Sequence, residues 1–120
     1  MEDLLIEALR PFGYPVRRQG SLGPEEAYPE SFFTFWNNAT EGDGFFDNQE
    51  TRIVWDYDLN FYSTDPDLVY STLEEAKKAL RKAGFLVDGL GHDVASDEPT
   101  HTGRGIHIIF SQNKKQGGAL

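Results

Sequence analysis

A short stretch near the C-terminus gathers the side chains of this sequence that are best suited to chemistry. It contains His92, Asp93, Asp97, Glu98 and His101. Imidazole and carboxylate groups bind divalent metal ions and transfer protons, so the stretch could belong to a small metal-dependent hydrolase, for instance one that acts on phosphate esters. The spacing is weak support, because a loop does not fix ligand geometry as a helical HExxH motif does. The other interpretation, which we favour, is an exposed turn that leads into a strand.

A row of polar residues offers a second possible site. In the segment 53–63 apolar residues alternate with Asp56, Asp58 and Asn60, so in a strand the two carboxylates would point the same way, about 7 Å apart. Two carboxylates can act as an acid and a base, but a row of solvated residues is the commoner arrangement. His107 likewise lies out of phase with its apolar neighbours, and we expect it on a partly covered face of a sheet.

Several common kinds of active site have no support in the sequence. It contains no cysteine, which excludes disulfides, thiolate zinc sites and cysteine nucleophiles. It also contains no glycine-rich dinucleotide motif, no phosphate-binding loop and no GxSxG motif. We therefore predict a protein that is not an enzyme, with no catalytic or metal-binding residues and no cofactor.

Length and charge narrow the class further. A chain of 120 residues suits one globular domain, which we place at residues 1–112, followed by a flexible tail at 113–120. The net charge of −9 disfavours binding to the phosphate backbone of DNA or RNA. No apolar run reaches the roughly 20 residues that cross a membrane, and the N-terminus is acidic where a signal peptide is basic. These features predict a cytoplasmic protein without a membrane partner.

The first half of the chain predicts one helix and two strands. The first ten residues have one apolar side and form a short helix that ends at a proline and a glycine. Residues 17–30 show no period and predict an irregular loop. Aromatic residues on both faces of 31–38 predict a strand covered on both sides, followed by a polar connection at 39–50. The alternation in 53–63 predicts a half-buried strand whose apolar face meets a helix.

The clearest single element is a helix over residues 65–83. Asp65 is suited to cap its N-terminus, and Gly84 is suited to end it. Acidic residues come early and basic residues late, as the helix dipole favours. Glu74 and Lys78 lie one turn apart and predict a supporting ion pair.

Two strands complete the predicted fold. Two glycines interrupt 85–94, which predicts a bent edge strand, and residues 103–112 form the last strand. The fold class is α/β of the α+β kind, a small and mostly antiparallel sheet of about four strands, with one main helix packed on one face and a short N-terminal helix. Phe45 and Phe46 are adjacent in the polar connection and costly to leave in water, so we expect them to contact a partner.

Four segments of the sequence together resemble a known family. They read FTFWNN, WDYDLNFYSTDPDLVY, KKALRKAGF and DVASDEPTHTGRGIHIIF, in that order. They resemble small proteins from the tail-assembly region of long-tailed phages and prophages, namely the tail completion or tail terminator proteins of the neck. The resemblance covers roughly residues 28–112, and DEPTHTGR is its most specific piece.

The resemblance implies a structural role in virion assembly. Members of that family are small α/β proteins that form a ring, commonly a hexamer, on the last ring of the tail tube, where they stop its growth and present a surface for head–tail joining. The implied partners are further copies of the chain, the major tail tube protein and the head–tail connector protein. The implied location is the virion, reached from the host cytoplasm during assembly.

Under this role, the ionisable residues described above would form contacts between proteins. Under it, the residues at an interface with another subunit or with the tube are Phe45, Phe46, Asp97, Glu98, His101 and Arg104. Asp56 and Asp58 could instead face a central channel, where negative charge would let DNA pass without specific binding.

Overall fold

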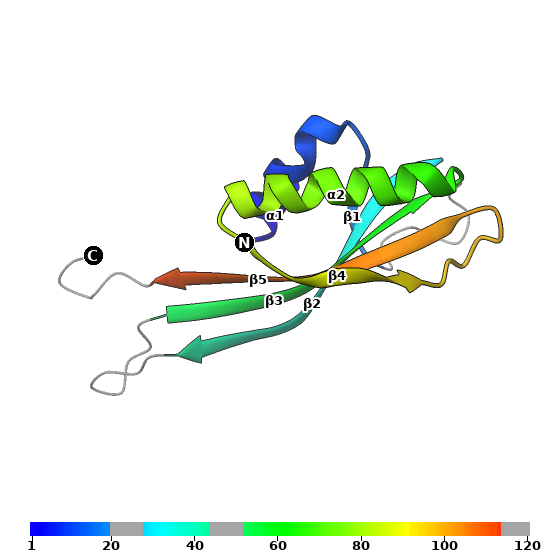
Figure 1. The fold of residues 1–120 in the computed structure, drawn as a ribbon. Coiled ribbons are helices and arrows are strands. Elements are labelled where there is room, and N and C mark those ends of the chain that lie inside the picture. The colour runs from blue at the N-terminus through cyan, green and yellow to red at the C-terminus, as the bar shows by residue number, and fades with distance from the viewer. Residues whose placement is uncertain (20–27, 44–51, 114–120) are drawn as a thin grey trace.

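The computed structural model describes residues 1–19, 28–43 and 52–113, which form one five-stranded sheet with the helices on one of its faces (Figure 1). The helical elements are α1 (Glu2–Leu9), the 3-10 helix η1 (Arg10–Phe12) and α2 (Pro66–Lys82). The strands are β1 (Val16–Arg18), β2 (Ser31–Asp43), β3 (Arg52–Ser63), β4 (Leu86–Val94) and β5 (Thr102–Asn113), in the spatial order β1-β2-β3-β5-β4. Only the β1–β2 pair is parallel. The predicted α+β class is confirmed, with five strands in place of about four.

Three of the predicted boundaries are wrong. Residues 17–30 do not form only a loop, because β1 runs alongside β2, with the Phe33 amide donating to the Pro15 carbonyl (2.8 Å) and the Gln19 amide to the Phe35 carbonyl (2.9 Å). A strand of three residues is too short to show a period. Residues 39–43 continue β2, and they are polar because they lie beyond the helices, where no core demands apolar residues (Figure 1). The last strand also reaches Asn113, and the rest of the predicted tail lies outside the described residues.

Helix α2 begins and ends where its sequence predicts. The Asp65 carboxylate accepts a hydrogen bond from the Asp67 amide (3.0 Å), and Gly84 follows the helix with a φ of 104°. The predicted Glu74–Lys78 pair does not form. Glu74 binds Lys77 instead (3.0 Å), because the nearly buried Lys77 ammonium also donates to the Leu90 carbonyl (2.9 Å) and so lies on the side of the helix that faces β4.

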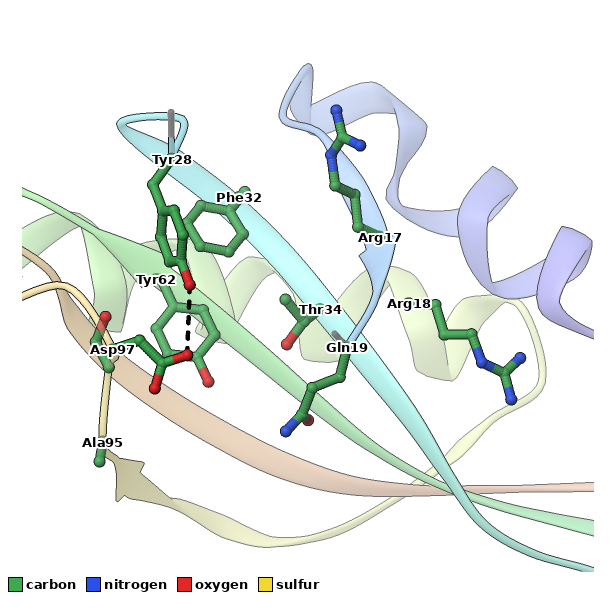
Figure 2. A pocket seen from close by; sticks show the side chains of 10 residues that line it. Arg17, Arg18, Gln19, Tyr28, Phe32, Thr34, Tyr62, Ala95 and Asp97 are labelled. Carbon is green, nitrogen blue, oxygen red and sulfur yellow. Dashed lines mark hydrogen bonds between the residues drawn. The ribbon is translucent and has the colours of Figure 1, made fainter. Parts of the chain in front are cut away.

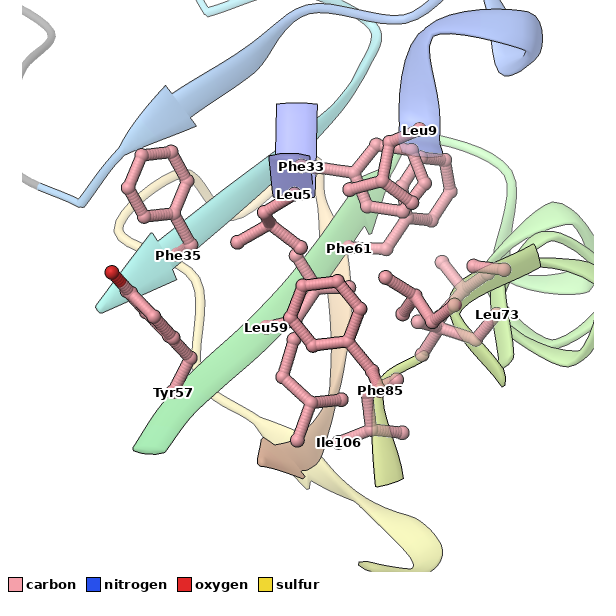
Figure 3. Close-up of a cluster of buried hydrophobic side chains, with 14 residues drawn as sticks. Leu5, Leu9, Phe33, Phe35, Tyr57, Leu59, Phe61, Leu73, Phe85 and Ile106 are labelled. Atoms are coloured by element: carbon pink, nitrogen blue, oxygen red, sulfur yellow. The ribbon is translucent and has the colours of Figure 1, made fainter. Parts of the chain in front are cut away.

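The core lies between the helices and one face of the sheet. Every second residue of the central strand points into it, so the period in 53–63 identifies this face correctly. Figure 3 shows the main buried side chains, which are Leu5, Leu9, Phe33, Phe35, Tyr57, Leu59, Phe61, Leu73, Phe85 and Ile106. The opposite face of β2 is covered only at Phe32 and Thr34, while Trp36 is 48% exposed. The prediction of a strand covered on both sides therefore holds for only part of 31–38.

The molecule is elongated. Its radius of gyration is 16.2 Å, whereas a compact domain of this length has about 13.6 Å. The extra length comes from the ends of β2, β3 and β5, at residues 41–43, 52–54 and 111–113, which extend beyond the helices (Figure 1), whereas Trp55 and Phe110 still pack against the core. We call these three strand ends the arm.

Candidate functional site

The polar and aromatic side chains that could bind a ligand or catalyse a reaction lie mainly on the sheet face opposite α1 and α2. We call this face the open face. Strand register places them in cross-strand rows on that face. Thr34 lies opposite Asn60, Phe32 opposite Tyr62, and Asp58 opposite His107. The open face has an aromatic end, formed by Tyr28, Phe32, Tyr62 and His101, and an acidic end, formed by Asp56, Asp58, Asp88 and His107.

The aromatic end is a set of rings packed on the sheet. The rings of Phe32 and Tyr62 stack with their centroids 5.2 Å apart, and Tyr28 and His101 meet Phe32 edge-on. Tyr62 can lie close to β5 because Gly103 has no side chain; a Cβ there would stand 2.6 Å from the ring. These rings therefore form a preorganised surface.

The segment DEPTHTGR forms a turn over this aromatic end, and hydrogen bonds hold the turn in place. The Tyr28 hydroxyl donates to the Asp97 carboxylate (3.3 Å), and the amide of Glu98 donates to the Ser96 hydroxyl (3.2 Å). His101 Nε2 donates to the Pro29 carbonyl (2.8 Å), because a carbonyl can only accept. The ring therefore carries its proton on Nε2, which leaves Nδ1 to accept from the Thr100 hydroxyl (3.0 Å).

Arg104 does not join the other predicted interface residues. It lies opposite Phe61 in the register, on the sheet face that bears the helices. There its guanidinium binds Asp93 (2.9 Å) and lies 4.9 Å from the ring centroid of Tyr70. Phe45 and Phe46 lie outside the described residues. The structure therefore brings together Asp97, Glu98 and His101 and separates Arg104 from them.

The alternative hydrolase site does not assemble in the structure. Asp93 binds Arg104, Asp97 binds Tyr28, and His101 binds a backbone carbonyl. Within 1–19, 28–43 and 52–113, no three His, Cys, Asp or Glu side chains are grouped so that they could hold a metal ion. Asp93, Asp97 and His101 thus have separate partners and no common centre.

A pocket of about 200 Å³ opens at the aromatic end, between β1 and the segment 95–97 (Figure 2). Its lining residues come from four parts of the chain, namely Arg17, Arg18, Gln19, Tyr28, Phe32, Thr34, Tyr62, Ala95, Ser96 and Asp97. Burial raises the pKa of Tyr62, against the opposing effect of the hydrogen bond from Asn60 and of the nearby Thr34 hydroxyl. Desolvation, and after it the nearby Asp97 carboxylate, raises the pKa of Tyr28. Both phenols therefore stay neutral at physiological pH and can donate hydrogen bonds.

The sequence predicts only part of this pocket. The period of two places Tyr62 on the face away from the core, and Asp97 is among the predicted interface residues. Arg17, Gln19 and Tyr28 fall in the stretch that the sequence predicts to be irregular, and no local pattern marks them. They reach the pocket because β1 pairs with β2.

The acidic end is built around an imidazole held by two carboxylates. His107 Nε2 binds Asp56, and His107 Nδ1 binds Asp88 (3.2 Å). Burial alone would lower the pKa of His107, but the hydrogen bonds to Asp56 and Asp88 outweigh it and raise the pKa above its usual value. Asn38 also donates to Asp56 (3.2 Å). Asp56 is therefore not a simple solvated residue, and its partner is a histidine that the sequence does not pair with it.

Comparison with known proteins adds no family assignment to this geometry. No known family model matches the chain, and no curated protein matches it. Among the helices of the described residues, none is long and apolar enough to cross a membrane.

Proposed function

We propose that this chain is a structural protein of virion assembly, which completes the tail tube of a long-tailed phage and joins it to the head connector, as a ring of identical subunits. The proposal starts from the sequence resemblance, which spans the strands, α2 and the DEPTHTGR turn. Its support from the geometry is the uncovered half of the open face. That half presents apolar side chains where a self-contained protein would present polar ones.

The exposed apolar side chains have a definite arrangement. Trp36 is 48% exposed and lies opposite Asp58, and Leu86 is 67% exposed and lies opposite Ile109. Leu90, in the bent part of β4, is 84% exposed. Trp36 and Leu86 lie on the open face, because their strand neighbours Asp58 and Ile109 do. A neighbouring subunit or the tail tube would cover them and gain apolar burial, about 25 cal/mol per Å².

The proposal also explains the acidic residues without assigning them catalysis. Asp97 and Glu98 belong to the turn beside the aromatic pocket, where charge serves hydrogen bonding between proteins. Asp58 lies beside the His107 cluster on the open face. If this face lines the channel of the ring, its carboxylates repel the DNA that passes through.

The test of the proposed function is reconstitution of tails. Tails made without this protein should have tubes of irregular length that do not join heads, and the added purified protein should bind one tube end and restore joining, as seen by electron microscopy. Binding along the tube wall, or no binding to either end, would contradict the proposal.

The channel assignment needs a separate variant. Asp58→Lys is the better choice, because Asp56 is already bound to His107 and Asn38. Assembled Asp58→Lys rings should retain DNA at low salt and release it as salt rises. Rings that assemble normally and retain no DNA would show that this part of the open face lies elsewhere.

A further inference from the structure

The aromatic pocket contains a carboxylate that lacks a cationic partner. The only polar contact of the Asp97 carboxylate within the described residues is the Tyr28 hydroxyl at 3.3 Å, which is longer than the roughly 2.5–2.7 Å of a strong hydrogen bond between a hydroxyl and a carboxylate. Arg17 and Arg18 line the pocket, but their guanidinium groups point away from Asp97 (Figure 2), and Arg18 binds Glu2 (2.8 Å). Asp97 is therefore the one carboxylate among the lining residues, and it is exposed to an incoming ligand.

The other walls of the pocket suit a flat cationic group. Tyr62, which is only partly buried, supplies the ring over which a cation is attracted. Thr34 is 8% exposed, and its hydroxyl forms no hydrogen bond of normal geometry, although it lies near enough to Tyr62 to affect the phenol pKa. A guanidinium group stacks on aromatic rings and binds carboxylates with two parallel N–H groups, whereas an ammonium group does neither as well.

The size of the pocket points to a single side chain. Its volume is about 200 Å³, whereas sites for small molecules and cofactors usually span roughly 300–1,000 Å³. Arginine side chains that fill aromatic pockets are also frequent centres of binding energy at protein interfaces. An arginine side chain meets each requirement of charge, shape and size.

We propose that this pocket binds an arginine side chain of a partner protein. The inference deepens the proposed assembly role and rests on it for the existence of a partner. The pocket would place the guanidinium at Asp97 and Tyr28, with the aliphatic stem against the Tyr62 ring.

The charge of the chain identifies the kind of partner. At a net charge of −9, a protein with a basic surface is attracted to this chain more strongly than a second copy is. Arg10, Arg18 and Arg104 already bind Glu7, Glu2 and Asp93 within the chain. The occupant that we propose is an arginine on a different protein with a basic surface, and a second copy is the alternative outcome of the test.

The experiment measures binding of N-acetyl-arginine amide to the isolated full chain by amide chemical shifts in NMR. N-acetyl-citrulline amide is the neutral control ligand of the same shape, and N-acetyl-lysine amide tests the preference for a planar cation. We expect shifts at residues 28–34 and 95–98, and binding about tenfold weaker for citrulline, since one charged hydrogen bond is lost. Asp97→Asn should weaken arginine binding about tenfold as well.

Variants of the protein separate the pocket from its surroundings. Thr34→Val keeps the volume of the side chain and should weaken arginine binding, while Asp3→Asn, which removes a carboxylate on α1 outside the pocket, should leave it unchanged. Equal binding of arginine and citrulline, shifts elsewhere, or no effect of Asp97→Asn would overturn the proposal.

The source of the arginine is tested by sedimentation of the chain alone. We expect a monomer at low salt; self-association that Asp97→Asn abolishes would make a second copy the occupant and overturn our choice of partner. Because these measurements use the isolated chain, a failure here leaves the tail reconstitution to decide the proposed function.

Discussion

The two carboxylates around His107 should make the stability of the fold depend on pH. We consider the substitution His107→Gln, which keeps a hydrogen-bonding side chain of similar size and removes the titrating charge. The contact with Asp56 joins two side chains that are 30% and 31% exposed, whereas Asp88 is 71% exposed. We therefore assign about 1–2 kcal/mol to the first contact and at most about 0.5 kcal/mol to the second.

The sign of the pH dependence follows from the raised pKa. The pKa of His107 in the folded state lies above its ordinary value of 6.5, so the folded state binds the proton more tightly than the unfolded state. The stabilisation is thus fully present below about pH 6.5 and is lost as the pH rises through the higher pKa of the folded state. The free energy of unfolding of the parent protein should exceed that of His107→Gln by about 1–2 kcal/mol at pH 5.5, and the difference should shrink as the pH rises through the raised pKa of the folded state.

The assay is urea denaturation at several pH values, because urea does not screen charges as guanidinium chloride does. His92→Gln, the same substitution at an exposed histidine of β4, is the matched control. A difference between parent and His107→Gln that is constant with pH, or that grows as pH rises, would refute the assignment of a protonated imidazole between two carboxylates.

Three further substitutions test other parts of the structure. Gly103→Ala should lower the free energy of unfolding by about 1–3 kcal/mol, because its Cβ would meet the Tyr62 ring at 2.6 Å; the loss should be smaller in a Tyr62→Ala background. Asp65→Ala should cost about 1 kcal/mol in urea denaturation, since it removes the cap of α2. Phe45→Ser combined with Phe46→Ser should leave the melting temperature nearly unchanged and block ring or tube association; an unfolded double variant would instead place these residues in the core.

The elements that the sequence predicts well are those with local signals. The sequence of helix α2 contains the N-cap residue Asp65 and the terminating glycine Gly84, and both have the predicted roles in the structure. The period of two in β3 identifies the core face because successive side chains of a strand point to opposite faces, so the apolar residues mark the buried face. The predicted pair Glu74–Lys78 does not form, and the reason lies outside the helix. The Lys77 ammonium donates to the Leu90 carbonyl on β4, and in this position it also binds Glu74.

The candidate site depends on contacts that no local pattern contains. The aromatic pocket joins β1, β2, β3 and the segment 95–97, so it exists only once the strand register is set. The same is true of His107, which lies directly opposite Asp58 but binds Asp56, its diagonal neighbour on β3. The period of two predicts which face bears these side chains. Which residue each one hydrogen-bonds depends on the length of the side chain and on the distance between neighbouring strands.

Only the acidic end of the open face would respond to pH near neutrality. A protonated His107 ties β4 and β3 together and cancels part of the negative charge of the acidic end. As the pH rises, the loss of this proton weakens the tie between the strands and leaves Asp56 and Asp88 uncompensated. A basic partner would then be attracted more strongly to the acidic end, while the contacts of His107 with β3 and β4 would be weaker. Because the arginine pocket lies at the other end and its tyrosines stay neutral over this range, its contact with the partner would persist while the acidic end changes. The open face thus separates a contact that depends on fixed aromatic geometry from one that depends on protonation.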